Sequence, residues 1–145
     1  MKINQVVVIG SGTMGSGIAA QLCNANIPVT LLDLKTEISE QAREKIYKSR
    51  PPLLIDKSKI KNINIGNIND DFDTVKNADW IVEAVVERID IKHNIYEKIF
   101  KNRKSGAIVS SNTSSIPIKV LSEKLTNDEK KDFCITHFFN PVRYM

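Results

Sequence analysis

The sequence lacks the features that disulfide frameworks, metal sites and membrane-spanning helices need. Its 145 residues include two cysteines, Cys23 and Cys134, which lie far apart and have no metal-ligand pattern beside them. We interpret both as small buried hydrophobic residues and predict no metal site.

No apolar stretch approaches the roughly 20 residues that a membrane-spanning helix needs. The first nine residues carry one lysine and lead straight into a strand-like run, unlike a signal peptide. We therefore expect a cytoplasmic protein.

Aromatic residues are also scarce, at 6% of the chain, and the lysine-rich stretch 57–61 contains none. Nucleic-acid-binding surfaces commonly interleave basic and aromatic side chains. The net charge of +4 could steer an anionic ligand such as a nucleotide. Because the lysines are scattered along the chain, we interpret the charge as general composition and predict no nucleic-acid partner.

The chain shows no internal repeat, low-complexity segment or linker, which favours one domain over residues 1–145. Strand and helix patterns alternate throughout, as is typical of a mainly parallel α/β sheet covered by helices on both faces. An apolar stripe of Ile91, Ile95 and Ile99 marks one helix, and we interpret it as core rather than as part of a cofactor site. Strands are expected at residues 5–9, 29–33, 63–66, 80–86, 107–111 and 133–137, and helices around 14–24, 38–46, 91–100 and 118–125.

A glycine-rich loop follows the first strand. Residues 10–15 read GSGTMG, a GxGxxG pattern placed between a strand and a helix. Gly10 permits the tight turn, Gly12 lets a pyrophosphate approach the backbone, and Gly15 lets the helix pack close to the sheet. Free amides at the start of the helix, around Thr13 and Met14, would face the phosphates. The pattern predicts a dinucleotide site, the alternative being a glycine turn that binds nothing.

An acid at the end of the second strand supports this prediction. Asp33 is placed to accept hydrogen bonds from the adenosine ribose, and its charge would repel a 2′-phosphate. NAD is therefore favoured over NADP as the cofactor. Six strands with this loop predict a Rossmann-type, doubly wound sheet in the order 3-2-1-4-5-6.

Three further blocks stand at the ends of later strands: EAVVE at 83–87, SNTSS at 111–115 and HFFNP at 137–141. With the glycine loop, they resemble the 3-hydroxyacyl-CoA dehydrogenase family in order and spacing over nearly the whole chain, and HFFNP is the most specific block. The stretch 51–67 further resembles members fused to an enoyl-CoA hydratase module. The resemblance implies NAD-dependent oxidation of an (S)-3-hydroxyacyl-CoA to the 3-oxoacyl-CoA in fatty-acid β-oxidation.

The resemblance implies two catalytic residues. His137 would be the base that takes the hydroxyl proton, which suits a side chain with a pKa of about 6.5. Ser114 would hydrogen-bond the 3-oxygen of the substrate. The alternatives are a strand-end histidine bonded to backbone, and a serine that caps a helix beginning near Ile116. We interpret His93 as an ordinary surface residue.

The resemblance also places Glu87, Lys92, Asn112 and Asn140 along the nicotinamide half of the cofactor, with the small Ala84 beside it. For three of these a structural role is the alternative. Glu87 could favour the start of the following helix, Lys92 could be solvated helix surface, and Asn140 could hold a turn.

The family's enzymes continue into a helical domain that closes the acyl-CoA site, usually forms the dimer, and supplies a glutamate that orients the motif histidine. This sequence ends at Met145, eight residues after His137, and its segment 33–80 is shorter than the arm that many relatives use to contact coenzyme A. We therefore expect NAD binding, whereas the activity of the chain alone stays an open question. A separate chain with the helical domain is one expected partner. An exposed apolar edge favours self-association.

Two other hypotheses about the function remain open. One is a non-catalytic NAD-binding module, or a decayed remnant, that acts through a partner chain. The other is a different hydroxyacid dehydrogenase with the same first domain, which activity on a short hydroxyacid lacking CoA would support and which HFFNP argues against.

Overall fold

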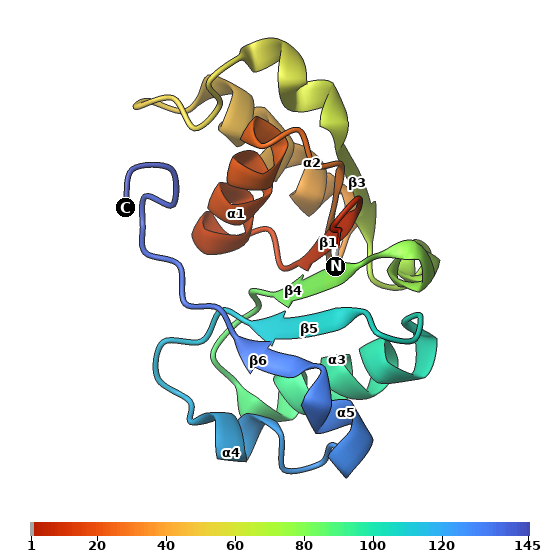
Figure 1. Cartoon of the computed structure of the whole chain (residues 1–145). Helices are drawn as coiled ribbons and strands as arrows, with labels where there is room; N and C mark the ends of the chain where they lie inside the picture. Colours follow the sequence, from red (N-terminus) through yellow and green to blue (C-terminus); the bar gives the residue numbers. More distant parts are fainter. Residues whose placement is uncertain (1) are drawn as a thin grey trace.

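The computed structural model describes residues 2–145, which form a six-stranded, fully parallel sheet with helices on both faces (Figure 1). The strand order β3-β2-β1-β4-β5-β6 is the predicted one, so the Rossmann-type fold is confirmed. The strands are β1 (Val6–Ile9), β2 (Val29–Asp33), β3 (Ile63–Asn67), β4 (Trp80–Glu83), β5 (Ile108–Ser111) and β6 (Phe133–Ile135).

Helices α1 and α2 cover one face of the sheet and α3 covers the other (Figure 1). Short helix α5 was not predicted, although it begins with a capping box in which the side chains of Thr126 and Glu129 each accept the other's backbone N–H. The helices are α1 (Thr13–Asn24), α2 (Thr36–Lys48), α3 (Ile89–Asn102), α4 (Ile118–Leu121) and α5 (Asn127–Lys131), with 3₁₀ turns η1 (Lys57–Asn62) and η2 (Phe72–Asn77).

The interior strands are mostly apolar because both faces of the sheet are covered. Alternate side chains of β1 enter different cores: Val6 and Val8 pack with α1 and α2, whereas Val7 and Ile9 pack with α3. In the strands the charged residues are Asp33 and Glu83, and each is the last residue of its strand. Both therefore lie at the carboxyl edge of the sheet, where open α/β sheets bind ligands.

The opposite, amino edge is held by Asp79, immediately before β4. Its carboxylate accepts the backbone N–H groups of Asn4 at 2.8 Å and Gln5 at 3.1 Å, and the Lys104 ammonium at 2.6 Å. These hydrogen bonds, chiefly the one from Lys104, lower the pKa of Asp79 to about 2.

The last residues of the chain cross back over α1. Val142 is buried, and its Cγ2 would lie 2.9 Å from a Cβ placed on Gly17, so a larger residue there would require Val142 to shift. The Tyr144 hydroxyl donates to the carbonyl of Pro52 at 2.8 Å. The segment after HFFNP is therefore packed against α1 and the loop that follows α2.

One cysteine prediction is confirmed and one is wrong. Cys23 is fully buried and its thiol donates to the Lys59 carbonyl, whereas Cys134 lies on edge strand β6 and is half-buried. An edge strand has fewer neighbours to cover its side chains. Burial raises the pKa of both thiols.

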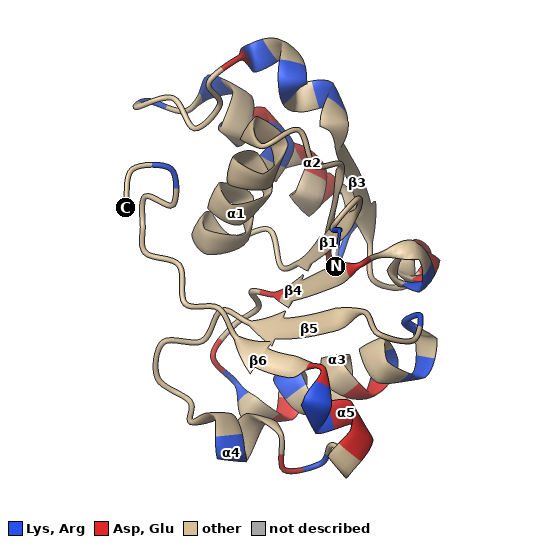
Figure 2. Cartoon of the chain, viewed as in Figure 1, with Lys and Arg blue, Asp and Glu red and all other residues tan. Residues whose placement is uncertain are grey.

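Helices α2, α3, α4 and α5 carry charged residues, whereas α1 carries none (Figure 2). Within residues 2–145, none of the helices is long and apolar enough to cross a membrane. The same residues hold no cluster of three or more His, Cys, Asp or Glu side chains able to bind a metal ion. The cytoplasmic location expected from the sequence stays a prediction.

Candidate cofactor and active site

The three glycines of the GxGxxG loop meet three different surroundings. Gly10 has a φ of +100°, and a Cβ there would lie 2.5 Å from the carbonyl oxygen of Ala84. A Cβ on Gly15 would lie 1.8 Å from the Gly10 carbonyl oxygen, so this glycine allows α1 to begin against the turn. A Cβ on Gly12 would meet no atom within 4 Å. Gly12 therefore faces open space, as close approach of a ligand to its backbone requires.

The start of α1 offers hydrogen-bond donors to this space. Among the residues that the structure describes, no acceptor is recorded for the N–H groups of Gly12, Thr13 and Met14. No side chain caps the helix, and its first turn has no acidic residue. Free amides together with the positive end of the helix dipole suit a pyrophosphate, so these residues fit the phosphates of a dinucleotide.

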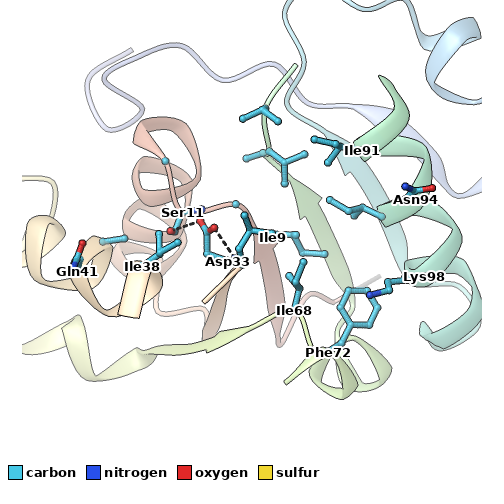
Figure 3. A pocket seen from close by; sticks show the side chains of 18 of the residues that line it. Ile9, Ser11, Asp33, Ile38, Gln41, Ile68, Phe72, Ile91, Asn94 and Lys98 are labelled. Atoms are coloured by element: carbon cyan, nitrogen blue, oxygen red, sulfur yellow. Dashed lines mark hydrogen bonds between the residues drawn. The ribbon is translucent and has the colours of Figure 1, made fainter. Parts of the chain in front are cut away.

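A cavity of about 570 Å³, here called the glycine-loop cavity, opens beside this loop. Figure 3 shows Ile38 and Gln41 of α2 on one side of it and Ile91 and Asn94 of α3 on the other. Its lining is Ile9, Gly10, Ser11, Gly12, Asp33, Leu34, Ile38, Gln41, Ala42, Lys45, Ile68, Phe72, Ala84, Val85, Val86, Ile91, Asn94, Ile95 and Lys98. The Ile91 stripe is core, as predicted: Ile95 and Ile99 are buried in the cluster under α3 and Ile91 packs against it. Ile91 and Ile95 also form part of the cavity wall.

Asp33 lies in the middle of the glycine-loop cavity and is tied to the glycine loop (Figure 3). Its Oδ2 accepts from the backbone N–H of Ser11 at 2.7 Å and from the Ser11 hydroxyl at 2.6 Å. Its Oδ1 accepts the N–H of Leu34 at 2.7 Å. A carboxylate has about four acceptor positions, so these three donors leave one unfilled. The sequence had not revealed the bonds to Ser11.

A second cavity of about 300 Å³, here called the histidine cavity, adjoins the first. Ala84 and Val85 line both, so the turn after β4 is the wall between them. The lining is Met14, Ala84, Val85, Glu87, Lys92, Asn112, Ser114, His137, Phe138, Phe139 and Asn140. All three blocks at the strand ends thus contribute to one site. Of the predicted site residues, Thr13 and Gly15 line neither cavity.

The two residues predicted to be catalytic share the histidine cavity and are exposed. The described residues provide no hydrogen-bond partner for the side chain of either Ser114 or His137, and the imidazole packs against the Phe139 ring with 4.7 Å between centroids. The alternative that His137 is hydrogen-bonded to the backbone is not supported, because its side chain makes no such bond within the described residues. The alternative of a capping serine is wrong, because α4 begins at Ile118 after Pro117 without a side-chain cap.

Behind the histidine cavity lies a buried ion cluster, here called the Glu83 cluster. Lys92 is 1% exposed and Glu83 is 0% exposed, and their charged groups meet at 2.6 Å. The Lys92 ammonium also contacts Glu87 at 3.0 Å. The alternative that Lys92 is solvated helix surface is therefore wrong: its ammonium is directed inward by two carboxylates.

Glu87 joins this cluster to the SNTSS block. It accepts from the hydroxyls of Thr113 at 2.6 Å and Ser115 at 3.0 Å. Although burial alone would raise it, the hydrogen bonds from Thr113 and Lys92 hold the pKa of Glu87 below its ordinary value. The side chain of Asn112 accepts the N–H of Phe138 at 2.9 Å, which ties the SNTSS block to HFFNP.

His93 is not the surface residue that we expected. It is 8% exposed, and its Nε2 lies 3.0 Å from the carbonyl oxygen of Val120 in α4. The residue follows Lys92 on the inward face of α3, where α4 covers it.

A parallel sheet of this order, with a glycine loop before α1 and an acid at the end of β2, defines a dinucleotide-binding domain. The family described as 3-hydroxyacyl-CoA dehydrogenase, NAD binding domain, matches residues 5–145, and the chain belongs to that family. NAD is the cofactor of this family.

Similar proteins are longer than this chain. A putative fatty acid oxidation complex trifunctional enzyme of Rickettsia felis is 44% identical over 151 residues, covering 99% of this chain and 21% of that protein. A probable 3-hydroxyacyl-CoA dehydrogenase of Deinococcus radiodurans is 41% identical, covering 100% of this chain and 44% of that protein. The crystal structure of 3-hydroxybutyryl-CoA dehydrogenase from Escherichia coli K12 superposes with a TM-score of 0.86 at 26% identity, covering 100% of this chain and 31% of that chain.

Proposed function

We propose that residues 1–145 are the NAD-binding domain of an NAD-dependent 3-hydroxyacyl-CoA dehydrogenase. The reaction is oxidation of an (S)-3-hydroxyacyl-CoA to the 3-oxoacyl-CoA in fatty-acid β-oxidation. One observation carries the proposal: the glycine-loop and histidine cavities meet at Ala84 and Val85, so a single extended ligand can reach from Asp33 to His137.

In this proposal the glycine-loop cavity takes the adenosine half of NAD. Asp33 uses its open acceptor position for a ribose hydroxyl, and its charge disfavours a 2′-phosphate. The free N–H groups at the start of α1, including those of Thr13 and Met14, bind the pyrophosphate. Glu87 and Lys92 then line the path of the nicotinamide half, with Asn112 and Asn140 on the other walls of the histidine cavity.

NAD, when bound, would supply the hydride acceptor for the carbon that bears the hydroxyl. His137 takes the hydroxyl proton at an imidazole nitrogen, and Ser114 donates a hydrogen bond to the same oxygen as it becomes a carbonyl. A catalytic histidine acts efficiently only when its ring is held in the required orientation. His137 is exposed, and its side chain makes no hydrogen bond within the described residues. Since the chain spans 21% and 44% of the two curated relatives compared above, we propose that a further domain, on the same or a separate chain, orients His137 and closes the acyl-CoA site.

Calorimetric titration of this chain with NAD, with NADP as the matched control ligand, tests the cofactor assignment. We expect binding of NAD and at least about tenfold weaker binding of NADP, because Asp33 faces the ribose. Failure to bind NAD would overturn the proposal, including the assignment of the GxGxxG loop to cofactor binding.

NADH oxidation with acetoacetyl-CoA in the same preparation tests the chemistry. We expect little turnover from the chain alone and turnover once the C-terminal part of a longer relative is supplied. Binding without turnover even then would favour the second candidate, a non-catalytic NAD-binding module, for which the exposed and unpartnered His137 is the supporting observation.

A further inference from the structure

Glu83 is a fully buried carboxylate that touches neither cavity. Its Oε1 accepts from the Lys92 ammonium at 2.6 Å and from the backbone N–H of Val85 at 2.8 Å. Its Oε2 accepts from the hydroxyls of Tyr96 at 2.7 Å and Ser111 at 2.6 Å. Four donors can thus occupy the acceptor positions of an ionised carboxylate. The Lys92 ammonium and the Val85 N–H can only donate, so both favour the charged form of Glu83.

The partners of Glu83 form the wall of the histidine cavity. Val85 belongs to the turn that separates the two cavities, and Lys92 lines the histidine cavity. The Lys92 ammonium has three donors. Two go to Glu83 and Glu87, and within the described residues the third has no recorded acceptor. Glu83 thus fixes both an N–H group of the wall and a buried ammonium with a free donor.

The Glu83 cluster also carries charge. The carboxylates of Glu83 and Glu87 and the single ammonium of Lys92 leave one net negative charge beside the histidine cavity. Glu83 and Lys92 are excluded from solvent, so water and salt screen these two charges weakly, whereas Glu87 is 42% exposed and is screened more strongly. The oxidised nicotinamide ring is a cation and the reduced ring is neutral, so a buried negative charge stabilises the oxidised form in particular.

We propose that Glu83 is a positioning residue whose buried charge holds Lys92 and the turn at Val85 in place and shifts the affinity of this domain toward oxidised NAD relative to NADH. The inference rests on the proposed function. Without Glu83 the cluster is neutral, and the discrimination between the two redox forms changes even if the cavity keeps its shape.

The test is the ratio of two dissociation constants in Glu83→Gln, measured by calorimetry for NAD and by fluorescence titration for NADH. Glutamine keeps the size of the side chain, and the hydroxyls of Tyr96 and Ser111 can accept from its amide as readily as they donate. We expect the ratio of Kd for NAD to Kd for NADH to rise on the order of tenfold, since one buried unit charge is removed. A merely structural role would weaken both forms equally, and an unchanged ratio overturns the inference.

Two variants complete the test. Tyr96→Phe removes one hydrogen bond to Glu83 without altering the charge, so the ratio should stay at that of the unaltered chain. If Glu83→Gln does not fold, Glu87→Gln carries the test, because it neutralises the same cluster at a side chain that is 42% exposed; an unchanged ratio there overturns the inference. Absence of binding by the unaltered chain would instead refute the proposed function and this inference together.

Discussion

The glycine-loop cavity and the histidine cavity share a wall but differ in how their polar groups are held. In the first, the chain itself fixes the central acid, since Asp33 accepts from Ser11 and Leu34. In the second, Ser114 and His137 are exposed and their side chains bond to nothing in the described chain. The groups that would bind a cofactor are thus organised in advance, whereas the groups that would act on a substrate are not.

The largest expected effect is on chemistry. In any preparation that turns over acetoacetyl-CoA, alone or with the C-terminal part of a longer relative, His137→Ala should lower kcat by about 10²–10⁴-fold because the base is lost. Steady-state NADH oxidation measures this. NAD affinity should change little by comparison, since His137 does not line the glycine-loop cavity, where the adenosine half would bind. A variant that retained its kcat would contradict the assignment of the base.

Two alanine variants of the glycine loop separate folding from binding. Gly15→Ala places a Cβ 1.8 Å from a backbone oxygen, so we expect a loss of about 3 kcal/mol or more in the free energy of unfolding. Gly12→Ala meets no atom within 4 Å and should keep its melting temperature. Its NAD affinity should nevertheless fall by about tenfold or more, because the methyl group enters the space for the pyrophosphate. Thermal melts of both variants measure the loss of stability, and calorimetry measures the loss of NAD affinity. Equal melting temperatures would contradict the packing argument.

Asp33→Ala tests whether the acid binds ligand or only the loop. Losing a charged acceptor for a ribose hydroxyl should weaken NAD binding by about 1.5–3 kcal/mol. Ser11→Ala is the matched control, because it removes one loop hydrogen bond and leaves the carboxylate in place. Calorimetry should show the larger loss for Asp33→Ala. Equal losses would mean that Asp33 acts only by ordering the loop.

The smallest effect is expected at Asp79, far from both cavities at the amino edge of the sheet. Its pKa is lowered from 3.8 to about 2 in the folded chain, so its stabilising contribution is complete above the ordinary value and disappears as the pH falls through about 2. Asp79→Asn should therefore be less stable than the unaltered chain at about pH 7 and equally stable near pH 2. Urea unfolding at several pH values measures the difference. NAD affinity should not change.

The sheet could be predicted because its determinants are local. Most strands contain a short run of apolar residues, and the glycine loop with Asp33 identifies the strand order by pattern alone. The capping box of α5 was equally readable, since Thr126 and Glu129 stand three apart, but this signal was missed.

The contacts of the site could not be predicted, because they depend on how separate elements pack together. Glu83 and Glu87 are only nine and five residues from Lys92, but nothing in the sequence shows that both carboxylates enclose its ammonium, and a lysine on a helix is usually solvated. The burial of His93 likewise depends on α4, whose position follows from the whole fold. Side-chain partners across elements require the tertiary structure.

The tie between Asp33 and Ser11 bears on redesign of cofactor preference. The usual route from NAD toward NADP replaces the acid with a neutral residue to admit a phosphate. Here that exchange would also release the Ser11 N–H and hydroxyl from their shared acceptor. A successful design would have to supply a new acceptor for Ser11 while it removes the charge.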